Sequence, residues 1–158
     1  MLPASQNLKT EVECWSFFLT DEILSKIVDS TNKYVNAMKQ KIADNHGEDH
    51  LKKLISKYPY FKTTTLAELK AFFGLQYYRA VYQWNHTSVR KFWMSNPIFT
   101  ATMALHRFYF LHHYIRFDDF ETTDARWKND RGAGIREVFE LWNDRLGQAI
   151  QTGEVSLF

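Results

Sequence analysis

Apolar residues recur every three or four positions along most of this chain, which is the spacing of one face of an α-helix. The clearest example starts at Thr20, a residue type that caps helices, followed by two acids that suit a helix N-terminus. It predicts a helix from Asp21 to about Ala43. Only three Pro and six Gly occur in 158 residues, so long helices are allowed. We therefore predict an all-α fold, in which the only strand considered is a short one at 154–158.

Similar local signals predict the other helices. Thr65 and Glu68 fit a capping box, in which the Thr hydroxyl accepts from the amide three residues on and the Glu side chain reaches back. Gly74, inside the helix that follows, indicates close approach of a neighbouring helix. The polar segment 120–134 is predicted to be a loop. The predicted helices are 21–43, 50–58, 66–82, 89–94, one from Thr100 to the Asp118–Asp119 pair, and 135–150. They form a single domain of four longer helices and two or three short ones.

The stretch HRFYFLHHYIRFDD, from His106 to Asp119, concentrates side chains that occur in active sites. His106 and His113 are two helical turns apart, about 10.5 Å of rise, which is too far for one metal ion. The adjacent carboxylates of Asp118 and Asp119 diverge instead of converging on a substrate. The apolar residues lie on two sides of the helix, which is typical of a helix packed between neighbours. They are Met103, Ala104, Phe108, Phe110, Leu111, Ile115 and Phe117. We interpret the stretch as structural, with a metal site as the less favoured alternative.

Other candidate sites are weaker. His46 and His50 are four residues apart, and their polar neighbours favour a solvated loop or a helix start over a metal site. Gly132 and Gly134 precede a helix and could hold an anion, but a loop-to-helix turn is the better interpretation. Cys14 is the only cysteine, so an internal disulfide is excluded and a reducing compartment is expected. Its aromatic neighbours predict that it is buried.

The charge and hydropathy of the chain limit where the protein can be located and which partners it can have. The net charge is +2 and the pI is about 8.6, which permits contact with nucleic acid without demanding it. The sequence has no run of 18 apolar residues and no signal-peptide pattern at its start. We expect a protein that is neither secreted nor bound to a membrane, with the cytoplasm as one possible location.

Five segments resemble, in order and spacing, the N-terminal helical part of piggyBac transposases and piggyBac-derived proteins. The resemblance covers roughly residues 13–150. One departure is Glu137, where the family usually has Pro, and another is the segment 125–134, which replaces a more regular approach to the last helix. The five segments are FFLTDEILSKIVDSTNKYV, ELKAFFGLQYYRAVYQ, VRKFWMSNP, MALHRFYFLHHYIRFDD and IREVFELWNDR.

The resemblance implies a role in transposition without carrying over a catalytic residue. The family's catalytic Asp triad lies beyond Phe158, in an RNase H-like domain, and Thr152–Phe158 is similar to the start of the segment leading into it. The expected organisation is a flexible N-terminus at 1–12, a helical domain at 13–150 and a truncated start of the catalytic domain at 151–158. The implied protein is a truncated or domesticated transposase derivative that is not an enzyme and needs no metal or other cofactor.

The same resemblance implies duplex DNA and a second copy of the chain as partners, with no small-molecule substrate. It also implies a location in the nucleus. Basic residues interleaved with aromatic ones suit phosphate contact, although they equally suit solvated faces. Charge and context select six candidates for DNA contact. They are Lys91, Arg107, Arg116, Arg126, Lys128 and Arg131.

Two other classes of function stay open. One is a protein-interaction module that does not bind DNA, or a transposon fragment without function. A domain separated from its catalytic partner exposes apolar surface, and Trp127, Trp142 and the tail 154–158 are the candidates for it. The other is a stand-alone hydrolase or metalloenzyme, which is disfavoured because the sequence shows no pairing of nucleophile and base and no ligand set.

Overall fold

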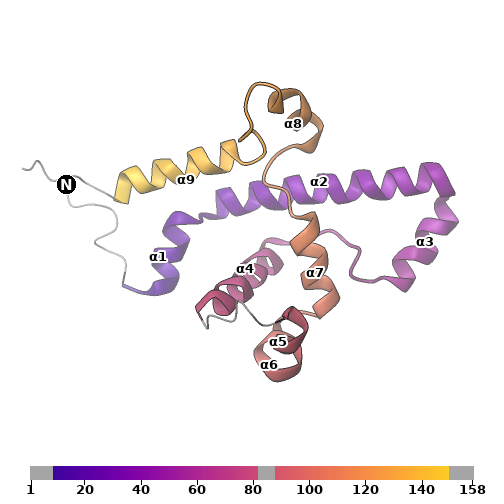
Figure 1. The fold of residues 1–158 in the computed structure, drawn as a ribbon, viewed down its shortest axis with the longest axis horizontal. Coiled ribbons are helices and arrows are strands. Elements are labelled where there is room, and N and C mark those ends of the chain that lie inside the picture. The colour runs from indigo at the N-terminus through magenta and orange to yellow at the C-terminus, as the bar shows by residue number, and fades with distance from the viewer. Residues whose placement is uncertain (1–8, 82–87, 150–158) are drawn as a thin grey trace, which may run out of the picture.

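Helices make up all the regular structure of the part of the chain that the computed structural model describes, residues 9–81 and 88–149. Figure 1 shows their arrangement. The prediction of an all-α fold is confirmed, although the helices are more numerous and several are shorter than expected. The strand considered at 154–158 lies outside the described residues. The helices are α1 (Glu11–Phe18), α2 (Asp21–His46), α3 (Glu48–Lys57), α4 (Leu66–Val81), α5 (Val89–Ser95), α6 (Pro97–Thr102), α7 (Leu105–Tyr114), α8 (Phe120–Trp127) and α9 (Arg136–Ala149).

The longest helix, α2, is the spine of the molecule (Figure 1). It starts where the capping signal predicts, because the Thr20 hydroxyl accepts from the amide of Ile23 at 3.4 Å. It ends at Gly47, whose φ of 84° is a left-handed value that favours glycine. There α3 turns back along α2, while α1 and α9 lie near its other end.

Two polar residues of α2 hold distant segments in place. The buried hydroxyl of Thr31 accepts from the backbone amide of Arg116 at 3.0 Å. The amide side chain of Asn32 makes a two-way bond with the backbone of Thr64, accepting at 2.7 Å and donating at 2.9 Å. The segment between α3 and α4 and the end of α7 are therefore both fixed to the spine.

Aromatic rings fill the core between α4, α5, α6 and α7. Phe108 lies 5.2 Å from Phe72 and 4.8 Å from Trp93 between ring centroids. Phe92 and Phe99 are also fully buried and stack at 5.3 Å. Such pairs add to the stabilisation that burial itself provides, which explains why 16% aromatic residues suit a domain of this size.

The stretch around α7 is packed on two sides, as predicted. Phe108, Phe110 and Leu111 are all buried. Ala104 is exposed, however, and the single helix predicted from Thr100 is wrong. Pro97 occupies the first turn of a separate helix, α6, which ends at Thr102. The backbone then becomes extended at Met103, whose carbonyl accepts from the indole of Trp93 at 2.7 Å. This tertiary contact breaks what the sequence pattern presents as one helix.

Two short helices were not predicted. The first, α1, has a complete capping box, in which the Thr10 hydroxyl accepts from the amide of Glu13 and the Glu13 carboxylate accepts from the amide of Thr10. The second, α8, lies in the segment 120–134 that was predicted as a loop. It forms because Asp119 caps it, with its carboxylate accepting from the amide of Glu121 at 3.1 Å.

The predictions for Cys14 and Gly74 are also wrong. Cys14 is exposed, because adjacent helical residues point about 100° apart and the half-buried Trp15 turns the thiol outward. A Cβ placed on Gly74 would meet nothing within 4 Å, so no neighbouring helix approaches it closely. Within 9–81 and 88–149, no helix is both long enough and apolar enough to span a membrane.

Candidate nucleic-acid interface

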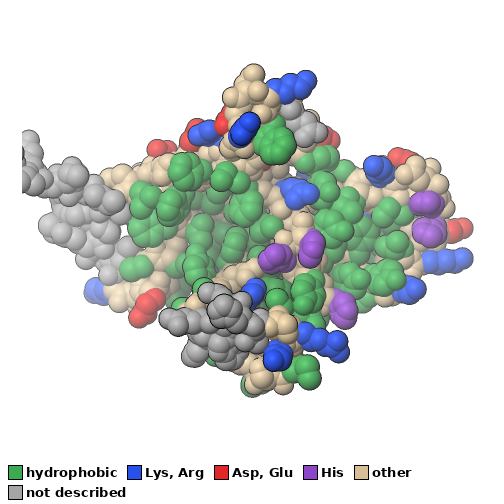
Figure 2. All heavy atoms as spheres, viewed as in Figure 1, with side chains coloured by type: hydrophobic (Ala, Val, Ile, Leu, Met, Phe, Trp, Pro, Cys, Tyr) green, Lys and Arg blue, Asp and Glu red, His purple; other side chains and the backbone are tan. Residues whose placement is uncertain are grey.

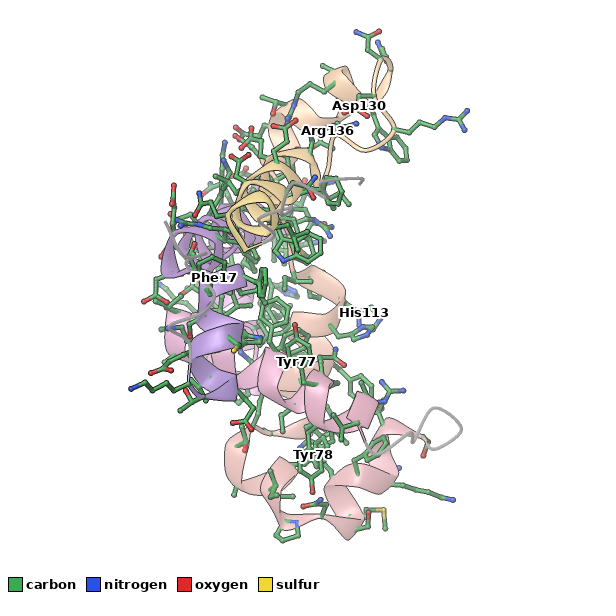
Figure 3. All side chains as sticks on the ribbon, turned by 90° about the vertical axis from the view of Figure 1, so that its left-hand side faces the viewer. Phe17, Tyr77, Tyr78, His113, Asp130 and Arg136 are labelled. Carbon is green, nitrogen blue, oxygen red and sulfur yellow. The ribbon has the colours of Figure 1, made fainter. Side chains whose placement is uncertain are left out.

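The structure separates the six cations that were predicted to contact DNA. Arg107 is a buried residue of α7, and Lys91 is exposed on α5. The other four lie on the segment from Arg116 to Arg131, which contains α8. Figures 1 and 3 place α5 and the α8 region at opposite edges of the molecule. The six cations therefore do not form one patch.

Arg107, one of the six residues predicted to contact DNA, has a structural role inside the protein. A guanidinium has five N–H donors, and all five are used inside the protein. Two go to the carboxylate of Glu68, at 2.8 Å and 2.6 Å. The other three go to backbone carbonyls of the α3–α4 connection, at Tyr60, Lys62 and Thr63. With 4% of its surface exposed, Arg107 has no donor left for a phosphate.

Glu68 also has a different role from the one predicted. The Thr65 hydroxyl accepts from the Glu68 amide at 3.2 Å, which confirms the first of the two hydrogen bonds of the predicted capping box. The Glu68 side chain does not reach back to Thr65, because it binds Arg107 and accepts from the Thr64 hydroxyl at 2.8 Å. Burial raises the pKa of Glu68, but the hydrogen bonds from Arg107 and Thr64 outweigh it and leave that pKa below its usual value.

Arg116 is the cation best placed for a phosphate. It lines a cavity of about 580 Å³ together with Tyr34, Phe120 and Trp127. Its guanidinium lies 4.1 Å from the centroid of the Tyr34 ring, close enough for a cation–π contact. Among the described residues its one guanidinium hydrogen bond goes to the carbonyl of Ile115 at 3.3 Å. The side chain is thus oriented by a ring, while most of its donors have no hydrogen-bond partner among the described residues.

Arg126 is held by Asp118, which is buried 96%. The Asp118 carboxylate also accepts from the Thr123 hydroxyl at 3.0 Å. Burial raises the pKa of Asp118, but the hydrogen bonds from Arg126 and Thr123 outweigh it and lower that pKa overall. Because Arg126 neutralises this carboxylate, it fastens α8 to the end of α7 and is less available to DNA than Arg116.

Asp119 faces a different partner. Its carboxylate accepts from the ammonium of Lys33 at 2.7 Å, in addition to capping α8. The two aspartates therefore diverge, and their predicted structural role is confirmed. The cations that compensate them are Arg126 and Lys33.

Lys128 and Arg131 are exposed on the turn after α8. The turn is ordered by its own contacts, since the Trp127 indole donates to the carbonyl of Arg131 at 2.9 Å while 61% of Trp127 stays exposed. The Arg136 guanidinium donates two hydrogen bonds to the Asp130 carboxylate, at 2.6 Å and 2.8 Å (Figure 3). The Arg136 guanidinium and the amide of Gly132 lower the pKa of Asp130 to about 2.

Gly132 and Gly134 are part of the same turn. The Gly132 amide donates to the Asp130 carboxylate at 2.8 Å, so an internal acid occupies the donor that an anion would need. The interpretation as a loop-to-helix turn is confirmed.

The histidines are spread over separate contacts. His106 stacks on Tyr60, and His113 projects from α7 with its ring nitrogen 2.9 Å from the carbonyl of Tyr109 (Figure 3). His46 ends α2, and its ring lies 5.2 Å from that of His50 in α3. Across the described ranges, no three His, Cys, Asp or Glu side chains come together in a way that could hold a metal ion.

The sequence did not locate an apolar groove of about 500 Å³ between α1 and α9. One side is formed by Phe139 and Trp142 of α9 and by Ile135, which directly precedes that helix. Figure 2 shows hydrophobic side chains gathered over the region of α9 and α4. Trp142 was a candidate for exposed apolar surface, and it is 36% exposed here. The remaining lining residues are Trp15, Phe18, Leu19, Tyr77, Phe117 and Val138.

Comparison with known families decides the broad class of the protein. A family model described as Transposase IS4 matches residues 10–157. The chain belongs to the Transposase IS4 family. No curated protein and no solved structure is significantly similar to it. The transposase part of the resemblance seen in the sequence is thereby confirmed.

In this member of the Transposase IS4 family, three carboxylates of the α8 region form ion pairs with basic side chains. Asp118 binds Arg126, Asp119 binds Lys33 and Asp130 binds Arg136. Carboxylates that hold divalent ions in a nuclease site must converge on a shared point. Among the described residues of this region, the carboxylates brace α8 and its turn and do not converge on a shared point.

Proposed function

We propose that this chain is the helical DNA-binding and dimerisation region of a piggyBac-type transposase or of a domesticated protein derived from one. The family match supports a transposase, and five segments in the piggyBac order support that subgroup. The structure gives a physical reason for several residues in those segments, since Thr31, Arg107 and Asp118 are buried and hydrogen-bonded. We assign no catalytic residue to the described chain, and a DNA-binding role would place the protein in the nucleus.

The observation that carries the DNA-binding proposal is the state of Arg116. Its guanidinium is positioned over Tyr34 and keeps donors free, beside the exposed Trp127. Lys128 follows Trp127 directly, and the carbonyl of Arg131 accepts from the Trp127 indole, so both cations are anchored to the same turn. Phosphate contacts of this kind provide most of the affinity of a protein for duplex DNA. Lys91 would make a separate contact at the other edge.

We expect the triple variant Arg116→Gln, Lys128→Gln, Arg131→Gln to weaken duplex binding and to reduce its salt dependence. Each phosphate contact contributes about 0.9 to the slope of log K against log salt, so losing three lowers the slope by about 3. Fluorescence anisotropy with a labelled duplex, across a series of salt concentrations, measures both quantities.

A control with the same change in charge is Lys41→Gln, Lys52→Gln, Lys53→Gln, in which all three substituted side chains are exposed on α2 and α3. It should keep at least half of the affinity. An equal loss in the control, or no affinity of the unmodified chain for duplex DNA at low salt, would refute the assignment of the interface.

The apolar groove supports a second part of the proposal, a homodimer in which a second copy covers α9. Ile135, Phe139 and Trp142 are 54%, 44% and 36% exposed although all three are large and apolar. Exposed apolar patches of this kind mark interaction sites in soluble domains. If the protein were an interaction module without DNA affinity, it would still dimerise but would fail the salt-dependence test.

We expect Phe139→Glu to shift the dimer–monomer equilibrium at least tenfold toward monomer, because a carboxylate would be buried at the interface. Size-exclusion chromatography with light scattering over a range of concentrations measures the shift. Val12→Glu is the control, since Val12 is 72% exposed on α1 and does not line the groove. An unmodified chain that stays monomeric throughout, or a control that dissociates equally, would exclude this interface.

A further inference from the structure

A second cavity lies away from the α8 region, between the α3–α4 connection and the start of α7. Its volume is about 810 Å³. Tyr58, Tyr60 and Lys62 of the connection form one side, and Met103 and His106 form the other. Sites for small ligands and single nucleotides have volumes of roughly 300–1,000 Å³. The cavity can therefore take one nucleotide unit, whereas a duplex is too wide for it.

The floor of the cavity is rigid. Arg107 binds three successive parts of the connection through the carbonyls of Tyr60, Lys62 and Thr63. Asn32 fixes the next residue, Thr64, from the other side. A site held in this way loses little conformational freedom when a ligand binds.

Aromatic rings provide a stacking surface at the cavity. The rings of Tyr60 and His106 stack with centroids 5.6 Å apart and an angle of 18° between their planes. Tyr58 follows at 5.7 Å from Tyr60. His106 is exposed, so a further planar ring can extend the stack. Bases of single strands stack on aromatic side chains because every base has a π-face.

Two lysines, Lys57 and Lys62, lie beside the aromatic rings of the cavity. The ammonium of Lys57 lies 5.3 Å from the centroid of the Tyr58 ring, and Lys62 is exposed at the rim. Among the described residues that line the cavity, Glu68 is the only carboxylate, and it is already paired with Arg107. The two lysines therefore remain available to a phosphate that a bound base carries with it.

We propose that this cavity binds an unpaired nucleotide of single-stranded DNA, with the base stacked on His106 and Tyr60 and the flanking phosphate held by Lys57 and Lys62. The choice of DNA over other single strands rests on the proposed function of the chain as the DNA-binding region of a transposase. Strand breakage and joining produce unpaired ends, and a protein that also holds duplex DNA through Arg116 could keep such an end close to it.

The test compares a labelled single-stranded 12-mer with the duplex and the RNA of the same sequence, by anisotropy on the full chain. His106→Ala should weaken single-strand binding by roughly 5- to 150-fold, the loss expected when one stacked base is released. His106→Trp should restore binding. Duplex affinity and thermal stability should stay unchanged, since His106 is exposed and the duplex is assigned to the other edge.

His113→Ala is the matched control, because His113 is exposed on the same helix and does not line the cavity. Lys57→Gln with Lys62→Gln should lower the salt slope for the single strand by about 1.4, two contacts at roughly 0.7 each. Single-strand binding that is insensitive to His106→Ala, or equally sensitive to His113→Ala, refutes the site. Tighter binding of the RNA refutes the choice of DNA.

The two proposals fail in different ways. If the duplex binds and the Arg116 triple variant weakens it, while His106→Ala has no effect on the single strand, the cavity assignment is wrong and the proposed function stands. If neither duplex nor single strand binds at low salt, the DNA-binding function itself is wrong.

Discussion

Replacing Arg107 by Met should lower the free energy of unfolding by about 3–5 kcal/mol, because removing one partner of a buried ion pair leaves the other uncompensated. The Glu68 carboxylate would lose two hydrogen bonds, and three backbone carbonyls would lose their donor. Urea denaturation followed by circular dichroism at 222 nm measures this loss. The change would amount to a large fraction of the stability of a domain of this size.

Two further variants separate the buried pair from a general effect of losing an arginine. Arg90→Met removes an exposed arginine from α5 and should change stability by no more than about 0.5 kcal/mol. Glu68→Gln should cost less than Arg107→Met, because the amide oxygen can still accept from the guanidinium. If Arg107→Met and Arg90→Met are equally stable, the ion pair does not hold the α3–α4 connection in place.

Phe108→Ala should cost about 3–5 kcal/mol, since it removes a fully buried ring and leaves a cavity that α7 cannot close. The ring contacts Phe72 of α4 and Trp93 of α5, so its loss weakens the packing of three helices at once. Equilibrium denaturation in urea, with an unchanged m-value, would establish a loss of stability without a change of fold.

The neighbouring Tyr109→Ala is the control for this core prediction. Tyr109 lies on the same helix but is 38% exposed, so its truncation removes less buried surface. Phe108→Leu should recover part of the stability, because most of the volume is refilled. An equal cost for the Tyr109 and Phe108 variants would mean that the ring cluster does not form the core.

Arg107 and Phe108 explain the dense stretch that begins at His106. Their adjacent side chains point in different directions, one to the polar floor under the α3–α4 connection and one into the aromatic core. The stretch then ends in Asp118 and Asp119, which fasten and cap α8. Its histidines and aspartates make separate contacts, and within the described residues they do not converge on one metal ion.

Much of the fold could be predicted because its signals are local. At the start of α2, the Thr20 hydroxyl accepts from the amide of Ile23, and at the start of α4 the Thr65 hydroxyl accepts from the amide of Glu68. Both hydrogen bonds join residues three positions apart. The break between α6 and α7 could not be predicted in this way. It depends on the indole of Trp93, ten residues before the carbonyl of Met103 that it binds. Short helices such as α1 also carry too few turns for a periodic pattern to stand out.

The candidate site was predicted less well. Arg and Lys are residue types that suit phosphate contact, but charge along a sequence does not reveal burial. Arg107 and Arg126 are cations like Arg116 in the sequence, yet their partners Glu68 and Asp118 are assigned only by tertiary contacts. The Tyr60–His106 stack joins residues 46 positions apart, so no local sequence pattern could predict it.

The sequence by itself determined the helical class, most helix starts, the transposase family and the kinds of side chain available to bind DNA. These follow from periodicity, capping and motif order, which are properties of neighbouring residues. Only the tertiary structure decided which cations are free, where helices break and which rings share a cavity. Each of these depends on groups from distant segments meeting in space. Burial and hydrogen bonding there use all five donors of Arg107, while most donors of Arg116 have no partner among the described residues.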